Sequence, residues 1–217
     1  MTAEKTRQAI LDATEELLAH EGFAAMSLRA LTSKAGVNLA AVHYHFGSKE
    51  EVTKSALARR IAPINEQRLQ QLDELEATGK PPALRDVLRT FLAPVLLLAQ
   101  TDEGSRACRM FGRLLAEHPP FLRAWLTEHF RPVLQRYGQA FARTKPELST
   151  SQILWRLHFV IGAMTHTLLH AELLHAVSEG LCEGDEDDLL EQLLTFCASG
   201  FAAAPLMPHP TGGDKRS

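Results

Sequence analysis

Apolar side chains recur every three to four positions along most of the chain, which is the spacing of one face of an α-helix. Residues 4–21 are typical, because Ile10, Ala13, Leu17 and Leu18 follow this spacing while charged residues occupy the opposite face. No stretch alternates apolar and polar residues over the length of a strand. The pattern therefore predicts an all-α protein.

Capping residues, glycines and prolines divide this pattern into about nine helices. Ser27 and Asn38 are good N-cap residues, and a glycine follows nine positions after each of them. Two short helices are therefore expected over residues 28–35 and 39–46.

A longer helix is expected from Lys49, after the capping box that Ser48 opens, and Pro63 is expected to kink or end it near Ala62. Further helices are predicted over residues 83–100, 105–117, 120–143, 149–175 and 186–202. These signals divide the chain into an N-terminal domain (1–60) and a C-terminal helical domain (61–204). A disordered tail (205–217) is predicted from its few apolar residues.

Charge is distributed unevenly along the chain, whose net charge is −3. Between Ser27 and Arg60 there are two acidic residues against six basic ones, whereas no Lys or Arg occurs between Leu157 and Asp214. Local charge decides where a polyanion binds. Nucleic acid is therefore expected at the N-terminal third. The six basic residues are Arg29, Lys34, Lys49, Lys54, Arg59 and Arg60.

Several function classes are disfavoured by what the chain lacks. It has no apolar run of membrane-spanning length and no signal-peptide pattern, and its three cysteines form no C-x-x-C pair. Gly-rich phosphate loops and nucleophile motifs are also missing. We therefore expect a cytoplasmic protein that is not an enzyme and carries no cofactor or metal.

Residues 27–46 have the features of a helix-turn-helix. Gly36 supplies the positive φ that a tight turn needs, and Val37 fills the angle between the two short helices. The apolar positions expected to face the first helix of the chain are Leu28, Leu31, Leu39 and Val42.

The remaining positions of the second short helix are suited to the major groove of DNA. Small alanines near its start let the backbone approach the bases, and His43 can reach base edges. The hydroxyl of Tyr44 and the ammonium of Lys49 are placed to contact phosphates. The ring of Tyr44 is expected to pack against the following helix.

The pairs Gly-Phe, Leu-Arg and Gly-Val and the run Tyr-His-Phe-Gly-Ser-Lys-Glu within residues 22–51 resemble the N-terminal domain of TetR-family repressors. The resemblance extends over about residues 4–60. It implies that Arg29 touches a base or a phosphate, that Lys49 contacts a phosphate, and that a homodimer binds successive major grooves of a palindromic DNA operator. The predicted DNA-binding set is Ser27, Arg29, Asn38, Ala40, Ala41, His43, Tyr44, His45 and Lys49.

By the same resemblance, residues 61–204 bind a small-molecule effector and form the dimer. Apolar stripes on helices 149–175 and 186–202 are expected to pair with their copies in a four-helix interface, while part of each stripe can fill the core of one subunit instead. The stripes contain Leu154, Leu157, Ile161, Met164 and Leu168, and Leu189, Leu190, Leu193, Leu194, Cys197 and Phe201.

Polar groups within the apolar segments suggest a ligand pocket. A buried arginine is costly unless it meets an anion, so Arg109 is suited to hold the carboxylate of an apolar acid. Alternatively, Arg109 and Arg156 pair with Glu117, Glu128 or another acid across the fold. The predicted ligand-binding set is Arg109, Phe111, Trp155, His158, Phe159 and Gly162.

The segments Thr32–Lys49 and Trp155–Gly162 resemble the PsrA-type branch of the family, which includes fatty-acid-responsive regulators. This resemblance implies that the effector is a long-chain fatty acid or an acyl-CoA. The second expectation is an aromatic or drug-like apolar compound.

The alternative function is a helical metal-binding protein. His166, His170, Glu172 and His175 have spacings that occur in metal-binding helical bundles. A di-iron enzyme would need a second Glu-x-x-His motif, which the sequence does not contain. Histidines in a dimer core or pocket are the competing explanation.

Overall fold

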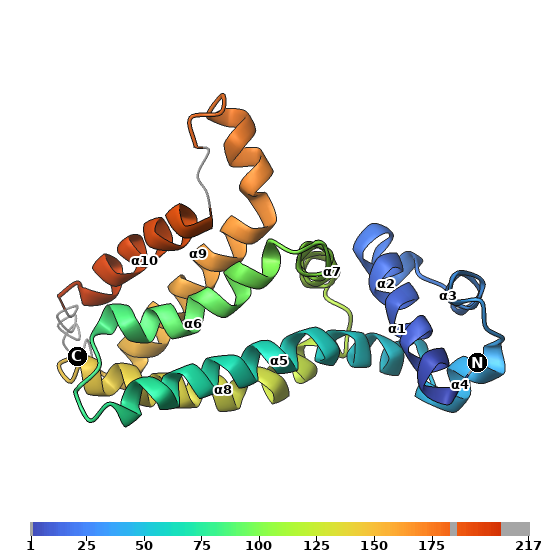
Figure 1. The fold of residues 1–217 in the computed structure, drawn as a ribbon, viewed down its shortest axis with the longest axis horizontal. Helices are drawn as coiled ribbons and strands as arrows, with labels where there is room; N and C mark the ends of the chain where they lie inside the picture. The colour runs from blue at the N-terminus through green and yellow to red at the C-terminus, as the bar shows by residue number, and fades with distance from the viewer. Residues whose placement is uncertain (1, 183–185, 205–217) are drawn as a thin grey trace, which may run out of the picture.

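The structure is a computed structural model, and it describes residues 2–182 and 186–204. Within these ranges the chain forms ten helices and no strand, which confirms the all-α prediction (Figure 1). The predicted tail lies outside the described residues. The helices are α1 (Ala3–His20), α2 (Gly22–Ala25), α3 (Leu28–Ala35), α4 (Leu39–Phe46), α5 (Lys49–Ala77), α6 (Leu84–Ala99), α7 (Asp102–Glu117), α8 (Leu122–Thr144), α9 (Thr150–Val177) and α10 (Glu186–Ala202).

Helices α1 to α4 form a lobe at one end of the molecule (Figure 1). The caps of its two short helices are those predicted: Ser27 accepts a hydrogen bond from Ala30 N at 3.1 Å, and Asn38 accepts one from Ala41 N at 2.9 Å. Gly36 ends α3 in the left-handed conformation with φ +64°. The additional helix α2 is a single turn that the apolar spacing cannot reveal, because it is too short to repeat.

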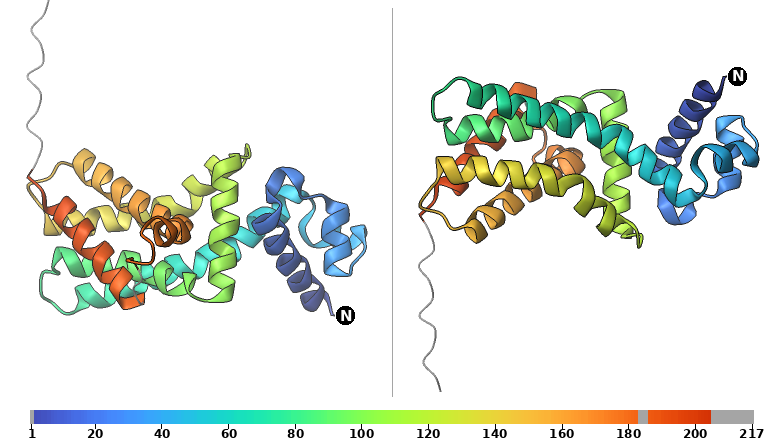
Figure 2. Two further views of the ribbon diagram at one scale, coloured as in Figure 1. Left: turned by 90° about the horizontal axis from the view of Figure 1, so that it is seen from above. Right: turned by 90° about the horizontal axis from the view of Figure 1, so that it is seen from below.

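Helix α5 connects this lobe with the remainder of the chain and crosses the predicted domain boundary (Figure 2). It does not end at Ala62 but continues through Pro63 to Ala77. Pro63 is exposed, whereas Leu57, Ile64 and Leu72 are buried on either side of it. Tertiary packing therefore holds the helix across the position where the proline removes a backbone donor.

Helix α7 begins earlier than the predicted residue 105, at Asp102 after the N-cap Thr101, so Gly104 lies within its first turn. A Cβ at Gly104 would lie 1.8 Å from the carbonyl oxygen of Leu98. The glycine therefore permits the close approach of α7 to the end of α6.

The C-terminal helices α5, α6, α8, α9 and α10 share a large apolar core. Most of the two predicted stripes belong to it: Leu157, Met164, Leu194, Cys197 and Phe201 are all buried within one subunit. For these residues the alternative that the stripe fills the subunit core is the correct one. A break at His170 (φ −131°, ψ 21°) divides α9 into two segments.

A second core joins the N-terminal lobe to the C-terminal domain. It combines residues of α1, such as Ile10 and Leu18, with Leu114 of α7 and Trp125 of α8. The two domains therefore pack through a continuous apolar layer and not only through α5. None of the helices in the described part of the chain is long and apolar enough to cross a membrane.

Candidate DNA-binding surface and ligand cavity

Helix α4 presents a largely open face to solvent. Tyr44 is 82% exposed, and Ala40 and His43 are also exposed. The expectation that the Tyr44 ring packs on the next helix is therefore wrong. The ring lies largely in solvent and contacts the ring of His45, with 5.1 Å between the two ring centroids. Leu39 was also expected to be buried, but it is 48% exposed. Val42 is the one residue of α4 that is fully buried against the lobe.

The ring of His43 is held by the end of its own helix. Its Nδ1 lies 2.7 Å from the carbonyl oxygen of Gly47. Because a carbonyl can only accept, Nδ1 carries the hydrogen, and in this tautomer Nε2 is the ring nitrogen that can accept. An acceptor in the major groove can pair with the amino group of adenine or cytosine.

Ion pairs engage most of the basic residues that indicated a positive N-terminal third. Lys34 pairs with Glu16 of α1, and Lys54 pairs with Glu50 and Glu51 of its own helix. Arg59 and Arg60 both pair with Glu15 of α1. The local charge count therefore overstated the positive potential of this region. It did not include Glu15 and Glu16, which α1 places beside these basic residues.

The remaining two basic residues of that set behave differently from each other. Arg29 is exposed on α3. Lys49 is half-buried, and its Nζ lies 4.4 Å from the centroid of the Phe23 ring. Burial lowers the pKa of this ammonium, while the charge of Glu117 raises it. A phosphate contact by Lys49 would require the side chain to leave Phe23.

Arg7 was not in the predicted DNA-binding set, although it lies beside α4, the second helix of the helix-turn-helix and hence the recognition helix. Its guanidinium carbon is 5.5 Å from the centroid of the Phe46 ring, at the end of α4. In the sequence Arg7 lies on the polar face of the first helix. That position alone does not indicate DNA binding, because it is typical of any solvent-exposed charged residue.

A cavity of about 410 Å³ lies within the C-terminal domain between α5, α6, α7, α8 and α9. Its walls are mainly apolar, with Phe91, Met110, Phe111, Leu126 and Phe130 among them. Size and lining are typical of a small-molecule site.

Arg68 of α5 is the buried cation in this wall. Its exposed fraction is 3%, and its Nε donates to the carbonyl oxygen of Phe91 at 2.8 Å. The sequence did carry a signal for it, because Ile64, Arg68 and Leu72 share one helical face at spacings of four. A helix that kinks or ends near Ala62, as Pro63 predicts, would not place these three residues on one continuous face.

Of the predicted ligand-binding residues, Phe111 lines the cavity and the other five do not. Arg109 is exposed and donates to Ser105 at 2.7 Å on the outer face of α7. The reason is helical phase: Met110 takes the core position of α7, so its neighbour Arg109 points outward. The remaining four are exposed on α9: Trp155, His158, Phe159 and Gly162. Arg156 donates to the backbone carbonyl oxygens of Phe201 and Ala204, and it forms no ion pair with a described acidic side chain.

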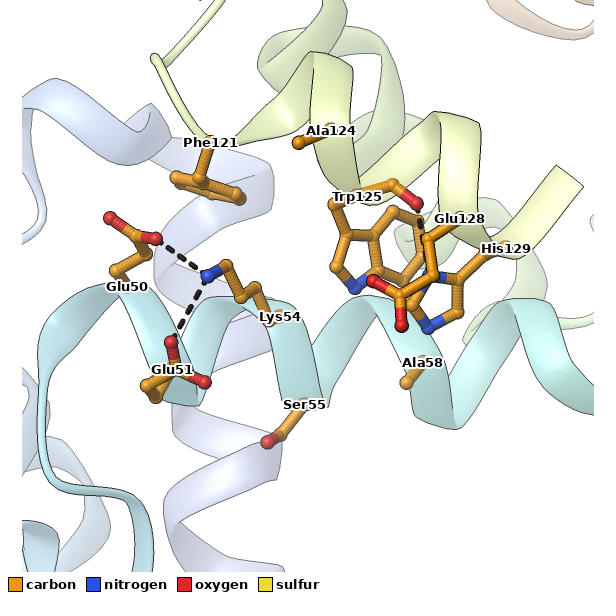
Figure 3. Close-up of a pocket in the computed structure, with 10 residues that line it drawn as sticks. All are labelled: Glu50, Glu51, Lys54, Ser55, Ala58, Phe121, Ala124, Trp125, Glu128 and His129. Carbon is orange, nitrogen blue, oxygen red and sulfur yellow. Dashed lines mark hydrogen bonds and ion pairs between the residues drawn. The ribbon is translucent and has the colours of Figure 1, made fainter. Parts of the chain in front are cut away.

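A second hollow lies outside the cavity, between the first turns of α5 and α8 (Figure 3). Glu50 and Glu51 reach toward the ammonium of Lys54, which also lies 5.6 Å from the centroid of the Phe121 ring. Two of the acidic groups of this hollow, Glu50 and Glu51, are thus paired within the chain.

The proposed metal ligands do not form a site in the described residues. The rings of His166 and His170 are neighbours, with centroids 4.7 Å apart. Among the described residues, no group of three or more histidine, cysteine, aspartate or glutamate side chains could hold a metal ion. The side chain of Glu172, one of the four predicted metal ligands, is not among those that the structure describes.

An all-helical chain with an N-terminal helix-turn-helix and a cavity-bearing C-terminal domain is the architecture of one-component bacterial regulators. The family model "Tetracyclin repressor-like, C-terminal domain" matches residues 89–200, and the model "Bacterial regulatory proteins, tetR family" matches residues 10–56. The chain belongs to the TetR family.

Curated relatives match parts of the chain. The HTH-type transcriptional regulator SrpR of Pseudomonas putida is 42% identical over 62 residues, which are 29% of each chain. The HTH-type transcriptional regulator AcrR of Shigella flexneri is 34% identical over 105 residues, 48% of this chain and 46% of its own. This chain thus spans less than half the length of these relatives.

Solved structures match over nearly the whole chain. The fatty acid degradation regulator FadR from Bacillus halodurans has a TM-score of 0.70 at 15% identity, covering 92% of this chain and 97% of its own. NalD, the secondary repressor of the MexAB-OprM multidrug efflux pump in Pseudomonas aeruginosa, has a TM-score of 0.65 at 25% identity, covering 92% and 98%. All these names describe regulators, in agreement with the prediction that the chain is not an enzyme.

Proposed function

We propose that this protein is a homodimeric transcriptional regulator that binds a palindromic DNA operator and releases it when an apolar effector enters the C-terminal cavity. The observation that carries the DNA-binding part is the open face of α4, where Tyr44 and His43 are exposed at the end of a capped helix-turn-helix. Arg29 and Lys49 are the proposed phosphate contacts, and Arg7 is added to them. Ser27 and Asn38 position the helices through their caps.

The proposed dimer forms through α9 and α10, and of the predicted stripes only Leu154 belongs to the exposed face that we propose as the interface. Leu154, Trp155 and Phe159 are exposed on one face of α9, and Phe196 is exposed on α10. The Trp155 and Phe159 rings stack on each other at 5.8 Å. Large exposed aromatic side chains are typical of protein interfaces.

The effector class follows from the cavity, whose walls are mostly apolar. A fatty acid or acyl-CoA, as the PsrA-type resemblance implies, is our first choice. NalD represses a multidrug efflux pump, which favours a drug-like apolar compound as the second choice. Release would follow from a population shift, in which the bound form holds the two recognition helices at a spacing that no longer fits successive grooves.

Selection of binding sites from a random duplex pool, followed by fluorescence anisotropy, tests this function. The expected result is a two-fold symmetric site with half-sites roughly 34–36 Å apart and an affinity that falls steeply with salt. Absence of any salt-dependent binding would contradict it. Stoichiometric zinc or iron in the purified protein would favour the metal-binding alternative instead.

A further inference from the structure

Arg68 is a charged group in an unusual position. Only 3% of its surface is exposed to solvent, and it lines a mainly apolar cavity. Among the side chains that the structure describes, no carboxylate forms an ion pair with Arg68. A buried cation without a counter-charge is unfavourable, so an anion that reached Arg68 would be stabilised there.

The guanidinium is held in place, but its donors are not all used. Nε donates to the Phe91 carbonyl, and Cζ lies over the Phe91 ring, 4.2 Å from its centroid. Among the described residues, Nη1 has a long contact to Asn65 Oδ1 (3.4 Å) and Nη2 a weak one to Met164 Sδ (3.7 Å). Beneath it, the hydroxyl of Tyr137 donates to the Arg68 carbonyl oxygen at 2.9 Å. Nη1 and Nη2 of the guanidinium therefore keep N–H donors that a planar anion such as a carboxylate can accept from.

Arg60, the other arginine of the cavity wall, provides a comparison within the same site. Its guanidinium donates to Glu15 and Glu103, so its charge is already compensated. Only Arg68 combines a place in the described cavity wall with a lack of a recorded acidic partner.

We propose that Arg68 is the anion-binding group of the effector site and that the effector is an amphipathic monocarboxylate. Its carboxylate would accept hydrogen bonds from Nη1 and Nη2, displacing the weak Met164 contact. Its apolar part would lie along the aromatic and aliphatic wall formed by Phe111, Leu126 and Phe130. The inference rests on the proposed function only in identifying this cavity as the effector site.

The test compares decanoate with 1-decanol, which share an alkyl chain but differ in charge, by calorimetric titration of the full-length protein. Decanoate is expected to bind at least about tenfold more tightly than the alcohol, as a charge-assisted pair implies. In Arg68→Met this preference should disappear through loss of the acid's affinity while the alcohol still binds. Arg109→Met, which removes the exposed arginine, is the matched control and should keep the preference.

Equal binding of acid and alcohol to the unaltered protein, or no binding of decanoate, would overturn the proposal, as would an unchanged preference in Arg68→Met. If Arg68→Met fails to fold, Arg68→Lys decides, because it keeps the charge but loses the planar fork and should bind the acid several-fold more weakly. DNA affinity is measured separately on the selected operator. A protein that prefers the acid but binds no DNA contradicts the proposed function and leaves this inference intact.

Discussion

The guanidinium of Arg60 donates to both carboxylate oxygens of Glu15, with 2.8 Å from Nε to Oε1 and 2.7 Å from Nη2 to Oε2. Glu15 belongs to α1 of the DNA-binding lobe and is 1% exposed, while Arg60 belongs to the wall of the cavity. Glu103 of α7 accepts a third hydrogen bond from the same guanidinium. One side chain therefore connects the cavity, the first helix of the lobe and α7.

Replacing Glu15 tests how much this connection stabilises the fold. In Glu15→Gln the charges of Arg59 and Arg60 lose their buried partner, and breaking a buried pair costs about 3 kcal/mol or more. We expect a clear fall in the free energy of unfolding by denaturant titration. Asp12→Asn is the control, because Asp12 pairs with Arg59 at the surface, where a pair contributes about 0.5 kcal/mol. Equal effects of the two substitutions would contradict this account.

Much of the fold could be predicted from the sequence because caps and glycines act locally. Ser27, Gly36 and Asn38 each determine a helix end through a hydrogen bond or a φ angle within a few residues. The ligand cavity could not be predicted in this way. Whether Arg68 or Arg109 faces the cavity depends on the phase of two helices from different parts of the chain, and neither composition nor local spacing contains that relation.

Helix α9 shows the same limit for the dimer face. It carries apolar residues on two sides, so Leu157 and Met164 could be taken as the outer stripe when they are in fact buried, while Trp155 and Phe159 lie outside. Periodicity identifies faces but does not say which one meets the subunit's own core.

His43 is predicted to read one base pair in each half-site. Because the Gly47 carbonyl accepts from Nδ1, the Nε2 of this tautomer can accept from the amino group of adenine or cytosine. His43→Ala should therefore relax preference at a single position, by about 1–3 kcal/mol per pair. Binding-site selection with the variant checks this, and an unchanged base preference removes His43 from the reading set.

Tyr44 is predicted to contribute to all operators alike. Its exposed ring carries a hydroxyl that can donate to a phosphate, so Tyr44→Phe should weaken binding to specific and unrelated DNA by about 1 kcal/mol. Thermal unfolding should be unchanged, since the side chain has few contacts to lose. A stability loss in Tyr44→Phe would indicate a structural role that its exposure does not suggest.

Glu76 should make the stability of the C-terminal domain depend on pH. Hydrogen bonds from Arg136, and then from Arg143, hold the pKa of this carboxyl below its usual value. A carboxyl whose pKa is lower in the folded state stabilises the fold above the unfolded pKa of about 4.3, and that contribution is lost as pH falls through the folded value.

Glu76→Gln should accordingly lower the free energy of unfolding by up to about 1 kcal/mol at neutral pH, since the pair is partly solvated. The difference from the unaltered protein should vanish near the folded pKa and below it. Glu74→Gln, on the same helix beside Gln70, is the control and should show no such convergence. A Glu76→Gln effect of the same size at every pH would mean that packing and not charge is responsible.

The exposed aromatic face of α9 is predicted to hold two subunits together. Trp155 and Phe159 are 59% and 63% exposed, and such side chains are common among the residues that dominate binding energy at interfaces. Phe159→Glu places a charge on this face and should convert the dimer to monomer in sedimentation velocity. Operator affinity should then fall sharply, because two half-sites can no longer be bound together. Leu97→Glu introduces the same charge at an exposed leucine of α6 and should leave the dimer intact. A dimer that survives Phe159→Glu but not Leu97→Glu would move the interface from α9 to α6.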